Sequence, residues 1–205
     1  MEQPVLSATQ RRIHTAAIRL FAERGVVQVT VSDLADYAGV ARGTIYNNVP
    51  SIETLFEEVA SHLAWEMNER IVASFHSENP SERLAMGVRA YVRRAHEEPD
   101  WGRFIARFAQ TSTSLRMLVM GEPAKDIQAA MKTGHFSLQA EQIPSVVTMI
   151  GSTVIGAIYL VREGVKTWRT AGSDSAEFLL KALGIDEQEA KRISVCDLPV
   201  LQNVQ

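Results

Sequence analysis

Apolar residues recur at three- and four-residue intervals along most of the chain, a spacing that places them on one face of a helix. The first such stripe predicts a helix that begins at Ser7 or Thr9 and ends at about Arg24, with Gly25 directly after its last turn. Its inward face consists of Ile13, Ala16, Ala17, Leu20 and Phe21. Because the helical pattern continues toward the C-terminus, the sequence predicts an all-α fold.

The segment from Thr30 to Val49 predicts two short helices joined by a tight turn. Thr30 is the expected N-cap, and Gly39 falls where the chain must adopt a left-handed conformation, which glycine does without steric cost. Ile45 faces inward on the second helix, while its polar side chains face outward. This arrangement is typical of a helix-turn-helix, whose second helix is narrow enough to enter the major groove of DNA.

Longer helices are predicted after this segment. One starts at Ser51 and extends to about Phe75, and Asp100 is the expected cap of a later one. Pro144 opens the most apolar helix of the chain, which another helix over residues 174–184 follows.

These elements predict two domains. An N-terminal three-helix domain with the helix-turn-helix is expected over residues 1–58, and a larger helical domain for effector binding and dimerisation over residues 59–205. With 205 residues and a hydrophobic share of 46%, the chain can bury a sizeable core.

Charge and cysteine content narrow the choice of function. The net charge of −3 argues against a general binder of polyanions, and residues 1–60 hold five arginines and no lysine against seven acidic side chains. Any nucleic-acid contact must therefore come from a local patch. Cys196 is the single cysteine, which rules out an internal disulfide and a multi-cysteine zinc site. No signal-peptide core and no uninterrupted apolar run of membrane-spanning length are found, so a cytoplasmic protein without a membrane partner is expected.

An enzyme is the rival class, and the sequence gives it little support. None of the five histidines has a metal-ligand spacing to a second ligand. Nucleophile-elbow, P-loop and dinucleotide-binding motifs do not occur. We therefore expect no catalytic residues, no metal and no cofactor.

Three segments, FAERG, TVSDLADYAGVARGTIYNNV and PSIETLFEEV, resemble in order and spacing the N-terminal domain of the tetracycline-repressor (TetR-like) family of bacterial transcriptional regulators. The resemblance covers roughly residues 10–60 and implies that the second short helix is the recognition helix. Arg42, Gly43 and Thr44 would then lie at base edges and backbone, while Thr30 and Tyr46 would contact phosphates. The predicted DNA-binding residues are Thr30, Arg42, Gly43, Thr44, Tyr46, Asn47 and Asn48.

Three positions depart from the family's usual pattern. Ile52 stands where the family usually has a lysine that contacts phosphate, and Val49 stands where an aromatic residue is common. Ala41 replaces the usual serine at the N-cap of the recognition helix, which forgoes about 1 kcal/mol of capping. These changes predict weaker or more selective DNA binding.

The resemblance also implies an effector cavity among the middle helices, which hold most aromatic and methionine side chains. Ordinary core packing explains each of these residues equally well. Arg103, Gln110 and Thr111 are further polar candidates. The predicted pocket residues are Trp65, Trp101, Phe104, Arg107, Phe108, Met131 and Tyr159.

A dimer interface is expected at the helices over residues 144–163 and 174–184, because the first of them is apolar all round and needs cover on two sides. The family resemblance implies that they form a four-helix interface with a second copy; burial inside one chain is the alternative. The predicted interface residues are Val147, Gly151, Val154, Ile155, Ile158, Phe178, Leu179 and Ala182.

The sequence thus favours a homodimeric transcriptional regulator, a repressor released from palindromic operator DNA by a small apolar or amphipathic effector. The alternative is a binding protein with the repressor fold and weak or no sequence-specific DNA affinity. Ile52 and the acidic N-terminal region favour that alternative.

Overall fold

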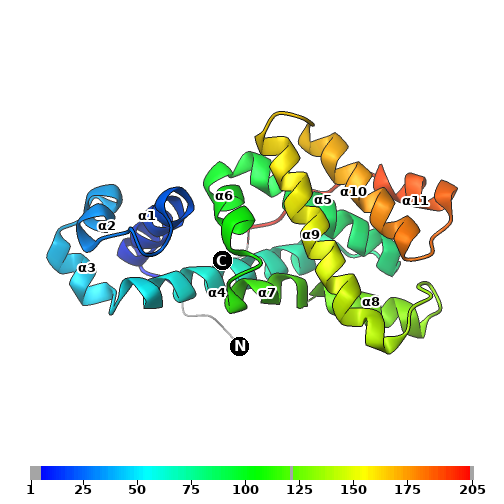
Figure 1. The fold of residues 1–205 in the computed structure, drawn as a ribbon, viewed down its shortest axis with the longest axis horizontal. Helices are drawn as coiled ribbons and strands as arrows, with labels where there is room; N and C mark the ends of the chain where they lie inside the picture. Colours follow the sequence, from blue (N-terminus) through cyan, green and yellow to red (C-terminus); the bar gives the residue numbers. More distant parts are fainter. Residues whose placement is uncertain (1–5, 121, 204–205) are drawn as a thin grey trace.

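The computed structural model describes residues 6–203 except 121, and within that range it consists of helices and their connecting loops. The expected all-α fold is confirmed. Figure 1 shows an elongated molecule with α1, α2 and α3 at one end and the other helices forming a larger body. In order, the helices are α1 (Ala8–Arg24), α2 (Val31–Ala38), α3 (Arg42–Asn48), α4 (Ile52–Ser74), α5 (Pro80–Glu97), α6 (Pro99–Phe108), α7 (Thr113–Met120), α8 (Glu122–Lys132), the 3-10 turn η1 (Ala140–Gln142), α9 (Ile143–Arg162), α10 (Trp168–Ala182) and α11 (Glu187–Ser194).

The predicted caps of the first two helices are present. The Ser7 hydroxyl accepts a hydrogen bond from the backbone N–H of Gln10, whose side chain in turn accepts from the backbone N–H of Ser7. Gly25 ends α1 at φ 83°, a conformation that disfavours any residue with a Cβ. The apolar stripe of α1 is buried, so this helix supports α2 and packs against α4 and α6.

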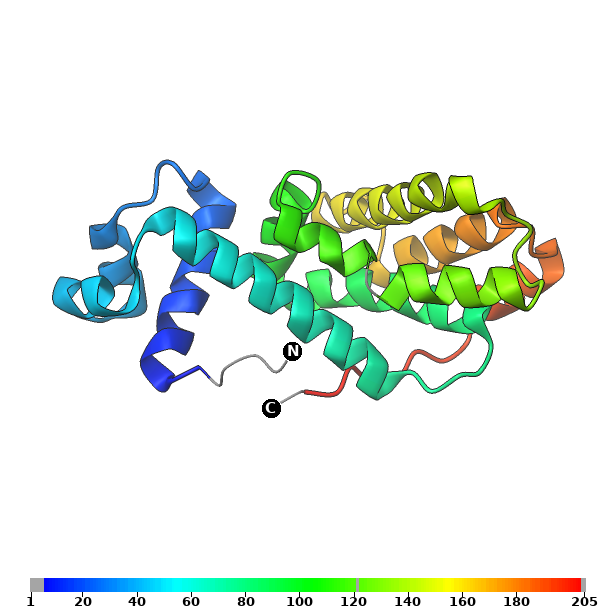
Figure 2. The same cartoon turned by 90° about the horizontal axis from the view of Figure 1, so that it is seen from below.

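Helix α4 is the continuous connection between the two ends of the molecule, as Figure 2 shows most clearly. Its 23 residues follow the Ser51 cap and extend from the helix-turn-helix along the body, where α4 packs against α7. The predicted single helix from Ser51 to about Phe75 is confirmed, because Phe75 is its C-cap.

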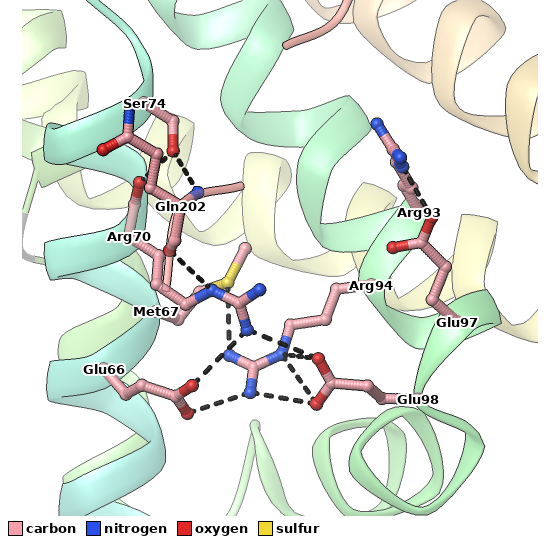
Figure 3. A network of polar contacts seen from close by, with 9 residues as sticks. All are labelled: Glu66, Met67, Arg70, Ser74, Arg93, Arg94, Glu97, Glu98 and Gln202. Atoms are coloured by element: carbon pink, nitrogen blue, oxygen red, sulfur yellow. Dashed lines mark hydrogen bonds and ion pairs between the residues drawn. The ribbon is translucent and has the colours of Figure 1, made fainter. Parts of the chain in front are cut away.

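A network of ion pairs fixes α4 to the body (Figure 3). The buried Arg94 guanidinium on α5 donates to Glu66 on α4 at 2.9 Å and to Glu98 at 3.1 Å. Arg70 adds longer contacts to the same two carboxylates, and its Nε donates to the carbonyl of Gln202 at 3.2 Å. Two guanidinium groups thus face two carboxylates, so burial leaves no net charge in the network.

The body is built around α5, which packs against α6, α8, α9, α10 and α11. Its contact with α10 is close at Gly172, where an added Cβ would lie 3.3 Å from Cγ of Arg89. That packing corrects the predicted start of this helix: α10 begins at Trp168, capped by the Thr167 hydroxyl, and not near residue 174. The glycine and serines of this segment therefore lie inside the helix, where small side chains allow α5 to approach.

The cap of α6 also differs from the expectation. Glu98 is the N-cap of α6 and Pro99 occupies the first turn, so Asp100 lies inside the helix and pairs with Arg103 instead of capping it. The fixed φ of proline suits a first helical turn, which moves the cap from Asp100 to Glu98, two residues earlier than predicted.

Helix α9 is the most apolar of the chain. The segment Ala140–Arg162 is long and apolar enough to cross a membrane by length and composition, and 33% of its apolar 18-residue window is buried in the structure. One side of α9 packs on α5 and α10, while Tyr159 on its outer side is exposed.

Candidate DNA-binding surface and effector cavity

The turn between α2 and α3 has the geometry that the sequence predicts. Gly39 adopts a left-handed conformation at φ 63°, and the backbone N–H of Val40 donates to the carbonyl of Ala35 at 3.0 Å. Arg12 on α1 donates to the Gly39 carbonyl at 2.7 Å, which ties the turn to the first helix. Ile45 is fully buried and anchors α3 below this turn.

The outer face of α3 is short and polar. Arg42, Gly43, Tyr46 and Asn47 are exposed, and a Cβ added at Gly43 would meet nothing within 4 Å. Thr44 and Asn48 are half-buried, and the Asn48 amide donates to the backbone carbonyl of Thr44 at 2.8 Å. Six of the seven residues expected to contact DNA thus share this helix, with Thr30 at the start of α2.

The Thr30 side chain is already occupied by capping. Its hydroxyl accepts from the backbone N–H of Asp33 and donates to an Asp33 carboxylate oxygen at 2.6 Å. The hydroxyl and the backbone N–H of Thr30 both donate to this carboxylate, and together with Arg24 at 2.8 Å they hold the pKa of Asp33 below its usual range. Asp33 therefore stays ionised and stabilises the positive end of the α2 dipole.

Arginine contacts explain how an acidic domain can still offer a positive surface. Within residues 6–60, four of the five arginines have partners inside the domain, whereas Arg42 has none. Its guanidinium is the cation left free on the recognition helix, so the local charge at α3 differs from the domain average. The partners of the other four are the Leu6 carbonyl for Arg11, the Gly39 carbonyl for Arg12, Glu23 for Arg19 and Asp33 for Arg24.

Two of the three departures from the family pattern serve packing in this structure. Ile52 is half-buried against the core, and Val49 is buried. Ala41 is the N-cap of α3 and makes no side-chain hydrogen bond there. After the recognition helix, Val49 and Ile52 therefore make apolar contacts where the family usually has an aromatic residue and a lysine.

The body encloses a cavity of about 520 Å³, a volume within the usual range of small-molecule sites. Helices α4 to α9 contribute to its walls, which are mainly aliphatic. Gly87 on α5 leaves part of this space open, because a Cβ there would meet nothing within 4 Å. The polar residues at its walls are Arg83, Tyr91, Gln110, Arg116, Asp126, Thr148 and Ser152.

None of the seven residues expected in the effector pocket lines this cavity; of the further polar candidates, Gln110 does. Phe104 and Phe108 instead form an aromatic cluster with Phe21 and Phe56, with ring centroids 4.9–6.5 Å apart. This cluster joins α1, α4 and α6, so its aromatic side chains fill the junction between the two ends of the molecule. Trp101 is buried beneath Arg94, whose guanidinium carbon lies 4.6 Å from the ring.

The other expected pocket residues also lie elsewhere. Arg107 on α6 donates to the backbone carbonyls of Ala22 and Glu23, at 3.1 and 3.3 Å, and so caps the C-terminal end of α1. Trp65 is half-buried beside His62, Met131 packs partly buried on the core, and Tyr159 is 57% exposed.

The residues expected at the dimer interface divide into two groups. Phe178 and Ala182 are exposed on α10, with Phe178 at 64% exposure. Val147, Val154, Ile158 and Leu179 are buried inside the chain, while Gly151 and Ile155 are half-buried. Four of the α9 residues, Val147, Gly151, Val154 and Ile155, line the cavity.

The polar cavity residues that sequence reasoning missed have no local motif. Arg83, Arg116 and Asp126 belong to three different helices and meet only after folding. One signal was present in the sequence: Gly87 interrupts the apolar stripe of Leu84, Val88 and Tyr91, and a missing side chain in such a stripe leaves space.

Two family models match the chain. The model described as "Bacterial regulatory proteins, tetR family" matches residues 13–59, and the model described as "Tetracyclin repressor-like, C-terminal domain" matches residues 79–195. The first match covers the helix-turn-helix, and the second covers the body from α5 to α11.

Curated proteins and solved structures agree with these matches. The HTH-type transcriptional repressor BepR of Brucella suis is 33% identical over 82 residues, which are 39% of this chain and 39% of that protein. The regulator AcrR of Shigella flexneri is 36% identical over 61 residues, 30% of this chain and 26% of that protein. The chain thus matches less than half the length of these two relatives. The crystal structure of RolR with resorcinol superimposes with a TM-score of 0.67 at 24% identity, covering 95% of this chain and 96% of that one.

Proposed function

This chain belongs to the tetracycline-repressor family of bacterial transcriptional regulators, and from that membership we propose that it is a homodimeric repressor released from palindromic operator DNA by a small apolar or amphipathic effector. Members of this family are DNA-binding regulators and not enzymes. We assign DNA binding to residues 1–58, and effector binding and dimerisation to residues 59–205.

The observation that carries this proposal is the exposed face of α3. Arg42 has no partner within the described part of the domain, and Tyr46 is 70% exposed beside it. A guanidinium can donate two parallel hydrogen bonds to guanine in the major groove, whereas a tyrosine hydroxyl suits a phosphate. The buried Ile45 and the Gly39 turn hold this face in a fixed orientation.

Dimerisation is supported by the outer faces of α9 and α10. Phe178 and Tyr159 are exposed there, and a Cβ at Gly156 would meet nothing within 4 Å. A second copy that covers these residues would present two recognition helices to two half-sites, which a palindromic operator requires. Phe178→Asp should shift the protein from dimer to monomer in sedimentation analysis. Lys132→Gln, at an exposed position on α8, is the control and should leave the dimer intact. A Phe178→Asp protein that remains dimeric would contradict this interface.

Effector control is supported by the position of α6. Ile105 of this helix and its C-cap Ala109 line the cavity, and Arg107 of the same helix caps α1. A ligand that prefers one position of α6 would therefore change the position of α1, and through it the spacing of the recognition helices. RolR, a structural neighbour, was crystallised with the small molecule resorcinol.

The test of the proposal is binding to the DNA upstream of the protein's own coding region, compared with random DNA of the same length. We expect sequence-specific binding that weakens steeply between about 50 and 200 mM salt, because phosphate contacts release counterions. Arg42→Ala should relax the preference for the upstream DNA, whereas Arg19→Ala, which removes a cation paired with Glu23, should retain it. Equal affinity for both DNAs would favour the alternative, a binding protein with the repressor fold, which the packing role of Ile52 supports.

A further inference from the structure

The cavity in the body differs in polarity between its interior and its rim. The interior is formed by aliphatic side chains from α4, α5, α6, α7 and α9, such as Ile71, Val88 and Ile150. Tyr91 is buried among them, and burial raises the pKa of its hydroxyl, which therefore stays neutral. A charged group placed in this interior would lose its hydration without compensation. Any charge on a ligand must therefore lie at the rim.

Two arginines reach the cavity, and only one of them is paired. Arg83 donates from Nε to Asp126 at 2.8 Å and from its terminal nitrogen to the Ser77 carbonyl at 2.6 Å. Arg116 on α7 is exposed, and its one hydrogen bond is to the Thr113 hydroxyl at 3.0 Å. Within the described residues, no carboxylate lies within ion-pair distance of Arg116. The rim therefore carries one uncompensated positive charge.

Uncharged hydrogen-bonding groups complete this rim. Gln110, in the turn after α6, and Ser152 on α9 are exposed where they line the cavity, and neither side chain has a hydrogen-bond partner in the part of the chain that the structure describes. Thr148 is also at the rim, but its hydroxyl donates to the Pro144 carbonyl at 2.8 Å. The cavity thus combines an aliphatic interior with a cationic, hydrogen-bonding mouth.

From this polarity we infer that the effector is an amphipathic monocarboxylate, with its hydrocarbon part in the cavity and its carboxylate paired with Arg116. The inference rests on the proposed function and names the chemical class of the effector. One free guanidinium matches the single charge of a carboxylate in bidentate geometry. A phosphate monoester, which carries about 1.5 to 2 negative charges, would leave charge uncompensated beside Asp126.

The experiment compares decanoate, decan-1-ol and decyltrimethylammonium, three probes with the same hydrocarbon chain and different head groups. Binding to the full chain is measured by calorimetry without DNA, below the micelle-forming concentration of each probe. We expect decanoate to bind about five- to tenfold more tightly than decan-1-ol, and the cationic probe to bind most weakly. Equal binding of decanoate and decan-1-ol would overturn the inference.

Arg116→Gln is the decisive variant, because Arg116 is exposed and its replacement does not disturb the core. It should lower decanoate affinity to that of decan-1-ol and leave decan-1-ol binding unchanged. Lys132→Gln removes an exposed cation that does not line the cavity and should change neither value. Decanoate binding that is unaffected by Arg116→Gln would overturn the assignment.

The two proposals fail in different assays. Equal affinity of the wild-type protein for upstream and random DNA would contradict the regulator function, whereas calorimetry without DNA decides the effector class. If decanoate binds through Arg116, its addition should also lower the affinity of the wild-type protein for its upstream DNA. In Arg116→Gln, about five- to tenfold more decanoate should be needed to weaken the same DNA complex to the same extent.

Discussion

The helix-turn-helix domain has its candidate site on its outer surface, whereas the helical body has its candidate site in its interior. The small domain buries Leu20, Phe21 and Ile45 completely and displays a polar helix face to solvent. The body surrounds an aliphatic cavity of about 520 Å³. A recognition surface needs a rigid support, whereas a ligand site needs space that the fold leaves unfilled.

Arginine is used in the same way in both regions. Among the residues that the structure describes, the other arginines of the small domain have partners and Arg42 has none, and at the cavity Arg83 pairs with a carboxylate whereas Arg116 does not. Paired guanidinium groups stabilise local geometry, and an unpaired one leaves a charge for a ligand. The comparison therefore identifies one candidate binding residue for each region.

The largest expected effect is on the free energy of unfolding, and it compares the close-packed core around Phe21 with the wall of the cavity. Phe21→Ala should lower the free energy of unfolding by about 3–5 kcal/mol, because it leaves a cavity in close-packed surroundings. Ile155→Ala, on a cavity wall and half-buried, should cost about 1 kcal/mol, since its neighbours already lack contacts on one side. Urea denaturation measures both values, and equal losses would contradict the comparison.

A smaller effect separates base reading from phosphate contact on α3. Arg42→Ala should cost about 1–3 kcal/mol of operator binding and relax the base preference, because a base contact is lost. Tyr46→Ala should weaken binding to operator and random DNA by a similar factor. Fluorescence anisotropy with both DNAs measures these affinities, and identical profiles for the two variants would count against the assigned roles.

The stability of the folded protein should decrease in acid because of His14 of α1, which lies against α4. Burial, together with the nearby His62, lowers the pKa of His14 to about 4, so the folded state favours its neutral form. Since an unfolded histidine titrates near 6.5, the free energy of unfolding should fall by about 1–2 kcal/mol as the pH decreases from about 6.5 toward 4. Thermal unfolding across this range should be less pH-dependent in His14→Phe. An unchanged pH dependence in that variant would assign the effect to other groups.

The smallest expected effect concerns a glycine in the hollow region. Gly87→Ala should raise stability by about 0.5–1 kcal/mol, because alanine favours the helix and its Cβ enters the open cavity. Gly102→Ala is the opposite case, since its Cβ would lie 2.8 Å from the Ala95 carbonyl oxygen at the close crossing of α6 and α5. Thermal unfolding of both variants tests the contrast in sign, and two changes of the same sign would refute it.

The sequence by itself determined the local structure of the small domain. The Ser7 and Thr30 caps, the Gly39 turn and the buried Ile45 all depend on residues close together in the chain, so their spacing predicts them. The start of α10 was predicted too late, at a serine near residue 174, whereas the helix begins at Trp168 and its small residues pack helically against Arg89. Tertiary contact outweighed local propensity there.

Only the tertiary structure decided where the aromatic side chains and the cavity lie. Phe104 and Phe108 are as apolar as pocket residues, and nothing in their spacing reveals that Phe21 and Phe56 meet them at the junction. The cavity is a space between helices far apart in sequence, and Arg83, Arg116 and Asp126 reach it from three of them. A cavity and contacts between residues far apart in the chain produce no local hydrophobic periodicity, so they cannot be predicted from the sequence pattern.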